Sequence, residues 1–426
     1  MNQCPDEEGR MLLTRWIYDK GILPTGNEKE IMIPGWGFSY ALRPYLSSII
    51  GAMFMRVVSL FTISEQALLT ASRMTSVLAI TCCFYFCLRL GHCLFRRRSS
   101  AVLLAMLVCY LPQVMFLGMY QNCDSLSLAA VGAMLTVFVE GNDKKWRFWD
   151  CVRLGFAVAA ALLSYYSVYG WIFTIAIVCM IAVLSDSTIS EKGKVIIRAA
   201  ATVMGICLIC AGWFFIRNAA LHDGDFLGLS SEQASREAMR LQGLEIQYNS
   251  PMLNGESVLD FFRIHGTLWR RLTMQSFIGV FGYMNIFMGM EWYGIYYAIL
   301  VTGVIFYLIR IIHIHPTRKE GLLVILMLVS TIIGIVLHFW QSYSRDIQPQ
   351  GRYIETTIFY LAYMFAAGVD GTEFRIQGVQ SADSDMVQKK GWVDVRFDKL
   401  GVIVILIWVF LFFKVFFSTM IQMIPK

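Results

Sequence analysis

Charged residues are scarce in this chain. They make up 15% of the 426 positions, whereas ordinary soluble domains carry roughly a quarter, and hydrophobic residues reach 57%. One water-soluble core cannot bury that much apolar surface. The composition therefore excludes an ordinary soluble domain and favours a membrane protein.

Three further patterns are missing. The chain starts MNQCPDEEGR, which is polar and acidic rather than basic and then apolar, so no signal peptide is predicted. No inverted repeat of the kind found in many secondary transporters is visible. The net charge of +6 is spread over several loops instead of forming one basic stripe, which argues against a nucleic-acid partner.

Long apolar runs recur along the chain. A helix needs about 20 residues to cross a hydrocarbon layer roughly 30 Å thick. The runs predict an all-α integral membrane protein, a polytopic bundle of about ten spans with two large extracytoplasmic loops. The predicted spans cover residues 71–92, 100–119, 122–140, 152–168, 170–185, 197–217, 291–311, 321–340, 353–369 and 400–422.

Lys and Arg fall in alternate connecting loops, and short loops that are rich in these residues stay in the cytoplasm. We therefore expect a multi-pass protein of the cell membrane with an extracytoplasmic active face. The basic loops cover residues 96–98, 144–153, 192–198, 310–319 and 389–399.

This orientation divides the chain into six parts. They are a first extracytoplasmic loop (1–70), a first part of the bundle (71–217), a large extracytoplasmic loop (218–290), a second part of the bundle (291–369), a flexible cytoplasmic linker (370–399) and a C-terminal transmembrane helix (400–426).

The two extracytoplasmic loops contain helical patterns of their own. Residues 36–61 are apolar but interrupted by arginines, which predicts interfacial or re-entrant helices. The spacing of apolar residues over 258–272 predicts one amphipathic helix on the outer leaflet. Ser230 with Gln233 fits a capping box that opens another helix.

Most of the 11 cysteines lie inside apolar spans, where cysteine behaves as a small hydrophobic residue. Only Cys4 and Cys123 fall clearly on the outer side. A disulfide between them is the less favoured option, because no pairing follows from sequence alone.

Carboxylates gather on the outer face. Asp6 and Glu7 follow Pro5 directly, and such residues can act as a general base or hold a divalent cation. A solvated tail or a helix N-terminus is the alternative. Asn122 and Asp124 stand where a span begins, where helix capping is the alternative to a shared pocket.

Arginines occupy the same face. Arg217-Asn218 ends one span, with Asp225 close behind, and Gln350-Gly351-Arg352-Tyr353 opens another. Arginine can bind a phosphate through two parallel hydrogen bonds, although an arginine at the interface can also just snorkel to the headgroups. The surface suits a substrate that carries a phosphate and an apolar tail in the bilayer.

The order of these motifs resembles the GT-C superfamily of membrane glycosyltransferases, and within it a bacterial group of predicted polysaccharide-assembly proteins of uncharacterised function. The resemblance spans residues 5 to about 370. Its motifs are Pro5-Asp6-Glu7, Arg73, Pro112 ahead of Asn122-x-Asp124, Trp213-x-x-x-Arg217-Asn218, Gly224-Asp225, Ser276 with Phe281-Gly282, and Gln350-Gly351-Arg352-Tyr353.

The resemblance implies transfer of a sugar from a polyprenyl-phosphate donor to a cell-surface glycan or lipid-linked acceptor, with inversion at the anomeric carbon. It also implies contact with membrane lipid. It makes Asp6 the catalytic base and Glu7 its partner. It assigns the donor phosphate to Arg217, Arg352 and Arg73, and substrate binding to Asp124, Asn122, Asn218, Asp225, Gln350 and Tyr353. It specifies no cofactor beyond the option of a divalent cation.

Two departures from the resemblance stand out. Relatives have a spanning helix before the acidic loop, so we expect either a lost first span or an unaided translocation of the N-terminus. Relatives commonly have His in place of Arg10 and Lys at Tyr165-Tyr166, which leaves the contacts to the donor phosphate open.

Two other functions stay open at this point. A transporter or flippase of a lipid-linked saccharide would bind the same kind of ligand, but transporters place charges near the bilayer midplane, whereas here they lie at the outer rim. A non-catalytic scaffold of a polysaccharide-assembly complex is the other alternative.

Overall fold

The computed structural model describes residues 4–241, 250–371, 373–379, 390–396 and 399–421. Helices dominate these residues. The α-helices are α1 (Glu7–Lys20), α2 (Leu46–Ser59), α3 (Glu65–Leu94), α4 (Arg98–Cys109), α5 (Pro112–Leu117), α6 (Asp124–Asp143), α7 (Phe148–Leu162), α8 (Tyr169–Leu184), α9 (Lys192–Cys210), α10 (Gly212–Leu221), α11 (Leu229–Leu241), α12 (Val258–Ile264), α13 (Gly266–Ile278), α14 (Met290–His313), α15 (Arg318–Ser344), α16 (Ile358–Gly371), α17 (Leu400–Phe412) and α18 (Ser418–Met420).

Shorter elements connect these helices. The 3-10 helices are η1 (Lys29–Ile31), η2 (Tyr40–Leu42), η3 (Tyr166–Val168) and η4 (Gly351–Thr357), and a π-helical turn, η5 (Phe413–Phe417), joins α17 to α18. Two antiparallel hairpins are formed by β1 (Val280–Phe281) with β2 (Ile286–Phe287), and by β3 (Glu373–Val379) with β4 (Lys390–Arg396).

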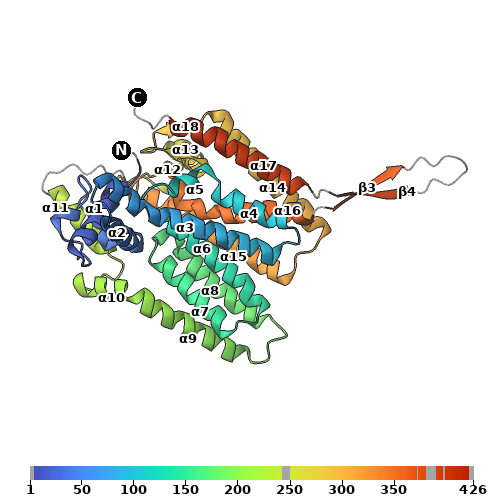
Figure 1. Cartoon of the computed structure of the whole chain (residues 1–426), viewed down its shortest axis with the longest axis horizontal. Helices are drawn as coiled ribbons and strands as arrows, with labels where there is room; N and C mark the ends of the chain where they lie inside the picture. The colour runs from blue at the N-terminus through green and yellow to red at the C-terminus, as the bar shows by residue number, and fades with distance from the viewer. Residues whose placement is uncertain (1–3, 242–249, 372, 380–389, 397–398, 422–426) are drawn as a thin grey trace, which may run out of the picture.

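The long helices form a bundle around α6 (Figure 1). α3 packs against α4 and α6, α7 packs against α6 and α9, and α16 packs against α4 and α14. The most apolar part of α6 is 94% buried, whereas that of α9 is 0% buried. α6 is therefore the centre of the bundle, and α9 lies at its periphery with its apolar side chains free to meet lipid.

Seven helical segments in the described residues are long and apolar enough to cross a membrane. They are Glu65–Leu94, Asp124–Asp143, Tyr166–Leu184, Lys192–Cys210, Met290–His313, Arg318–Ser344 and Leu400–Phe417. The three remaining predicted spans are helical but consist of shorter helices. One is formed by α4 and α5 together, one by α7 and one by α16. Proline lacks the backbone N–H that a continuous helix needs, and Pro112 starts a new helix after the break at 110–111. The all-α membrane fold is thus confirmed, whereas the count of ten spans stays a prediction.

The predicted basic loops over 144–153 and 310–319 lie at the same end of the bundle. Arg153 pairs with Glu140 at 2.6 Å, and Lys319 pairs with Asp143 at 2.8 Å. α6 runs from this end to Asp124 at the other end, where α1, α2 and α11 lie (Figure 1). The charged residues of the two ends are therefore separated by the length of a spanning helix.

The first loop contains α1, η1, η2 and α2. α1 packs against α2, and α2 packs against α3. α2 has 14 residues, fewer than the roughly 20 that a span needs. Its length agrees with the interfacial helix expected over 36–61.

The second loop differs in detail from the expectation. Two helices, α12 and α13, replace the single amphipathic helix over 258–272, and they meet at His265 and Gly266. A capping box between Ser257 and Asp260 opens α12. At the start of α11, the Asp225 carboxylate accepts hydrogen bonds from Ser231 N and Oγ at 2.8 and 2.9 Å. Asp225 therefore provides a hydrogen-bond partner for a backbone N–H of the first turn of α11.

The segment 370–399 was expected to be a flexible linker. Residues 372, 380–389 and 397–398 lie outside the described residues, so this expectation stays a prediction, but the rest of the segment contains two paired strands. β3 and β4 pair from Glu373 opposite Arg396 to Val379 opposite Lys390, and the hairpin projects away from the bundle (Figure 1). Both strands carry the β-branched and aromatic residues that favour strands, such as Ile376 and Trp392. The polar residues around them concealed this pattern.

The crossing of α3 and α4 yields a testable prediction. A Cβ atom added to Gly91 would lie 2.6 Å from the Cα of Ala101, so the two backbones would have to move apart. We expect Gly91→Ala to lower the free energy of unfolding by about 1–3 kcal/mol, the usual cost of overpacking. Thermal unfolding of the detergent-purified protein measures the effect.

Gly205→Ala on α9 is the matched control. Nothing lies within 4 Å of the Cβ position of Gly205, so this change should cause no loss of stability. Equal melting temperatures for both variants would contradict the tight α3–α4 crossing.

Candidate functional site

A large cavity opens at the end of the bundle where α1 begins. Its volume is about 1520 Å³, and its walls come from separate parts of the chain: the start of α1, the first loop, the turn before α8, α11, α15 and the segment before η4. Predicted site residues in the lining are Asp6, Gln350 and Tyr353. Segments that are far apart in the sequence thus meet around one space.

Asp6 stands at the N-terminal end of α1 in an unusual backbone conformation. Its φ is 61°, in the left-handed region that Asp tolerates better than most non-glycine residues. Its side chain makes no capping hydrogen bond to α1. The carboxylate instead accepts a hydrogen bond from Nη2 of Arg352.

Arg352 holds the centre of the site. Its Nε donates to Gln350 Oε1 at 2.7 Å, and its Nη1 lies 3.8 Å from Asp124 Oδ2. The Arg352 side chain is 3% exposed, whereas that of Asp6 is 36% exposed. Arg352 therefore contacts two predicted carboxylates, Asp6 and Asp124, from a buried position. Asp6 is the more exposed partner and faces the open cavity.

The glycine beside Arg352 is required by packing. A Cβ atom on Gly351 would lie 2.2 Å from the backbone N of Phe277. The N–H of Gly351 also donates to Ser276 Oγ at 2.6 Å. α13 therefore rests directly on the backbone of the Gln350-Gly351-Arg352-Tyr353 motif and fixes the position of the arginine.

Arg10, one of the departures from the resemblance, belongs to this site. Its guanidinium lies over the ring of Tyr40, 4.3 Å from the centroid, and its Nε has no hydrogen-bond partner among the described residues. Arg10 also interacts electrostatically with Asp6 and Asp124. Two buried arginines thus balance two carboxylates.

These charges control the protonation of Asp6. Burial alone would raise its pKa, but the positive charges of Arg352 and Arg10 outweigh burial and lower the pKa of Asp6 below its ordinary 3.8. Asp6 is therefore ionised at neutral pH and can accept a hydrogen bond from a ligand.

Glu7 points away from the cavity. Its carboxylate accepts hydrogen bonds from Arg73 at 2.8 and 2.6 Å and from the backbone N of Gln121 at 2.9 Å, and its side chain is 0% exposed. Glu7 and Arg73 therefore tie the first loop to α3 and to the turn before α6. The structure brings neither of them into the cavity lining.

A second ion cluster forms another part of the cavity wall, where η2 meets α11. Arg43 donates from Nε and Nη2 to Glu232, both at 2.7 Å, and Arg236 donates to the same carboxylate at 2.8 Å. Nη1 of Arg345 lies 3.9 Å from Glu232. All three arginines line the cavity. Burial alone would raise the pKa of Glu232, but Arg43 and Arg236 outweigh burial and lower the pKa to about 2.

Aromatic rings cover much of the remaining wall. The rings of Tyr165 and Tyr353 stack at 6.3 Å between centroids, and those of Tyr165 and Tyr166 stack at 6.2 Å. Aromatic side chains offer both an apolar face and, in tyrosine, a polar edge. The aromatic residues that line the cavity are Trp36, Phe38, Tyr40, Tyr165, Tyr166, Tyr169, Tyr283, Trp340 and Tyr353.

The other predicted substrate-binding residues have structural partners. Asn122 donates to the carbonyl oxygens of Leu117 and Tyr120 and accepts from Ser125 N, as expected for a capping residue. Asn218 donates to the carbonyl oxygen of Leu42 at 3.1 Å. Neither side chain lines the cavity.

Arg217 is also outside the cavity lining. Its Nη2 donates to the carbonyl oxygen of Leu23 at 3.0 Å, so it holds the first loop against α10. The structure does not bring Arg217 together with Asp6. The phosphate-binding role of Arg217 stays a prediction.

Sequence reasoning missed Glu232, Arg236 and Arg345 as site residues. Glu232 and Arg236 stand at i and i+4 on α11, a helical ion-pair spacing that is visible in the sequence. Their position beside Arg43 depends on how the large loop folds over the first loop, which no local pattern records.

Glu355 was missed as well. It is 2% exposed, and both of its carboxyl oxygens have no hydrogen-bond partner among the described residues. The like charge of Asp124 lies close enough to repel its carboxylate. Asp124 and Glu355 offer the oxygen ligands that a divalent cation prefers, and Asp124 also has Nη1 of Arg352 3.8 Å away.

These features define a multi-pass α-helical membrane protein with a charged, aromatic-lined cavity at one end. The chain belongs to the DUF2142 family, described as predicted membrane proteins, whose model matches residues 36–360. Among curated proteins no match was found.

Solved structures show similarity across most of the chain. ArnT from Cupriavidus metallidurans in the apo state is 13% identical with a TM-score of 0.49, covering 87% of this chain and 56% of its own. The Archaeoglobus fulgidus oligosaccharyltransferase complex with Zn and sulfate is 14% identical with a TM-score of 0.48, covering 86% and 45%. AglB from A. fulgidus, with an inhibitory peptide and a dolichol-phosphate, is 11% identical with a TM-score of 0.45, covering 86% and 46%. The chain thus spans about half the length of these proteins.

The Glu232 cluster gives a pH-dependent prediction. Because the pKa of Glu232 is 4.5 when unperturbed and about 2 in the fold, its ionised form should stabilise the fold by roughly 3 kcal/mol at pH 7. Glu232→Gln should lose this stability at pH 7, and the difference from the unchanged protein should shrink as the pH falls from 4.5 toward 2. Thermal unfolding at a series of pH values tests this.

The control is Asp19→Asn, which removes the exposed pair between Asp19 and Arg15 at 3.1 Å. Exposed pairs contribute up to about 1 kcal/mol, so this variant should change little at any pH. A loss of stability in Glu232→Gln that stays constant with pH would contradict the assigned ion pair.

Proposed function

We propose that this protein is an inverting membrane glycosyltransferase that transfers a sugar from a polyprenyl-phosphate donor to a glycan or lipid-linked acceptor on the extracytoplasmic face. The observation that carries the proposal is the pair of Asp6 and Arg352, which places an ionised carboxylate and a buried cation side by side at a large aromatic-lined cavity. A base and a phosphate-binding cation are the two groups that this transfer requires.

The reaction uses Asp6 as the base. Its free carboxylate oxygen accepts the proton of an acceptor hydroxyl while the hydroxyl oxygen attacks the anomeric carbon of the donor sugar. The bond from that carbon to the phosphate oxygen breaks, and the electron pair leaves with the polyprenyl phosphate. Attack opposite the leaving group inverts the anomeric centre.

Arg352 links the two halves of this reaction. In the structure its Nη2 donates to Asp6, and this contact lowers the basicity of the carboxylate. A donor phosphate competes for the same guanidinium, because arginine binds phosphate in the same forked geometry as carboxylate. Binding of the donor would therefore stabilise the departing phosphate and release Asp6 as a stronger base at the same time.

Other cations in the cavity support phosphate binding. Arg345 lies 3.9 Å from Glu232 and its side chain is 32% exposed, so it can turn toward a ligand without losing a close ion pair. Arg43 keeps two hydrogen bonds to Glu232 and positions that wall. Preorganised cations of this kind stabilise charge that develops on a leaving group.

The membrane-facing side of the cavity fits the lipid part of the donor. Leu337 and Trp340 on α15 line the cavity and are also 43% and 52% exposed at the surface of the protein. The cavity wall is therefore continuous with an apolar outer surface. A polyprenyl chain can follow α15 while its phosphate reaches the arginines.

The test is turnover of a polyprenyl-phosphate sugar by the purified full-length protein. A general base typically contributes about 10²–10⁴-fold in rate, so Asp6→Asn should lower kcat by that factor. Glu8→Gln is the matched control, because Glu8 is the exposed carboxylate two residues further on that also lines the cavity. It should keep its activity.

Equal turnover by the Asp6→Asn and unchanged proteins would remove Asp6 from the mechanism. Movement of lipid-linked saccharide across proteoliposomes without any product would replace the proposal with the flippase alternative. Retention of a partner complex without either activity would favour the scaffold.

A further inference from the structure

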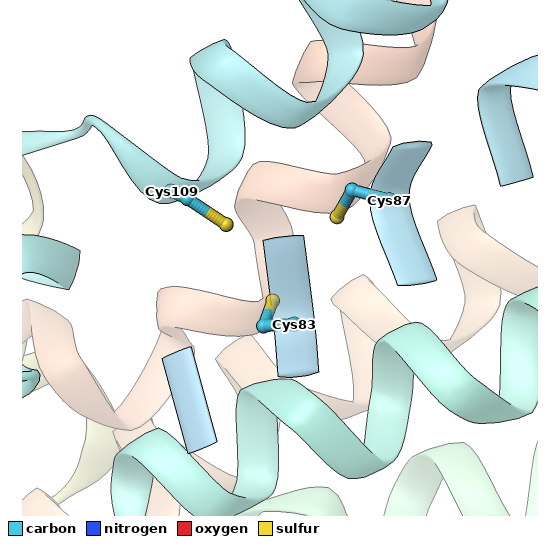
Figure 2. A group of neighbouring side chains, drawn as sticks. All are labelled: Cys83, Cys87 and Cys109. Carbon is cyan, nitrogen blue, oxygen red and sulfur yellow. The ribbon is translucent and has the colours of Figure 1, made fainter. Parts of the chain in front are cut away.

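Three cysteine thiols converge inside the bundle, far from the mouth of the cavity. Cys83 and Cys87 come from α3, and Cys109 is the last residue of α4. Their Sγ atoms all lie within 4.8 Å of one another, and Figure 2 shows the three sulfur atoms directed toward a shared space. The side chains are 0%, 0% and 1% exposed.

Helix geometry explains the convergence. Residues four apart lie on the same face of a helix, so Cys83 and Cys87 both face α4. The close approach of α3 and α4 at Gly91 and Ala101 brings Cys109 opposite them. Cys82, one residue away, is only half-buried and does not belong to the group.

The distances suit one metal ion with three sulfur ligands. A metal–sulfur bond is about 2.3 Å long, so three sulfurs around one ion in a plane stand on the order of 4 Å apart. The thiols already lie within 4.8 Å of one another, so small rotations close the site. Structural zinc takes four ligands, and no fourth Cys, His, Asp or Glu joins this group among the described residues.

We propose that Cys83, Cys87 and Cys109 bind one Cu(I) ion that joins α3 to α4. Soft sulfur ligands select Cu(I), which does not require a fourth ligand. On binding, the ion replaces the proton of one thiol, which leaves as H⁺, while the other two thiols coordinate through their lone pairs. One positive charge enters for each that leaves, so the apolar interior gains no net charge, and no electron is transferred.

This site is separate from the proposed reaction. The cysteines belong to the apolar core between the helices and do not line the cavity of Asp6. The ion therefore has a structural role, and its binding should stabilise the folded state, since a ligand that binds only the folded form shifts unfolding to higher temperature.

The test uses the full-length protein purified in detergent under reducing, anaerobic conditions. It is loaded with Cu(I) and challenged with a chromogenic Cu(I) chelator. The unchanged protein should retain one copper per chain and melt at a higher temperature with copper than without. Cys83→Ala, Cys87→Ala and Cys109→Ala should each lose the retained copper and the shift in melting temperature.

Two control variants distinguish the loss of a metal ligand from the general effect of replacing a cysteine in the bundle. Cys82→Ala changes the sequence neighbour of Cys83, and Cys151→Ala changes a cysteine on α7 that is equally buried at 0% exposure. Both should retain copper. Loss in all five variants, or retention in all five, would overturn the site.

A second measurement requires no variant. X-ray absorption at the copper edge of the loaded, unchanged protein should show three sulfur neighbours. Two sulfurs, or nitrogen and oxygen neighbours, would show an adventitious ion and contradict the proposal, even if a cysteine variant failed to fold.

Discussion

The ion pair between Asp6 and Arg352 is the interaction on which the rest of the site depends. It joins residues that are 346 positions apart in the chain. Buried charges are tolerated only where partners compensate them, and the surrounding groups supply this compensation: Gln350 orients Arg352, Arg10 adds a second cation, and Gly351 allows α13 to rest on the motif. The remainder of the first loop is held by the pair of Glu7 and Arg73, outside the cavity lining, and by Arg43, which lines the cavity.

Much of the fold follows from apolar periodicity, because each membrane helix must satisfy its own backbone hydrogen bonds and therefore leaves a long apolar run. The predicted spans fall mainly on helices among the described residues, but the count of ten stays a prediction and local breaks within the spans were not predicted. The interruption before Pro112 and the division between α12 and α13 depend on single residues within otherwise continuous patterns. The β3–β4 hairpin escaped because its apolar residues are diluted by polar neighbours.

The site was predictable where a short motif coincided with an element end. Asp6, Asp124, Gln350, Arg352 and Tyr353 were proposed for this reason, and the structure brings them together, while their roles stay predictions. Arg217 has the same appearance in sequence, yet its guanidinium turns to a backbone carbonyl of the first loop. The direction of a side chain at the end of a helix depends on tertiary packing, and the positions of Glu232 and Glu355 depend on it even more.

The separation of Asp6 from Arg352 along the chain also bears on biogenesis. Asp6 leaves the ribosome well before Arg352, which follows only after α15 has been made. Until then the carboxylate has no cation from η4 beside it. A nascent chain that has not yet reached η4 therefore cannot form the pair that we assign to catalysis.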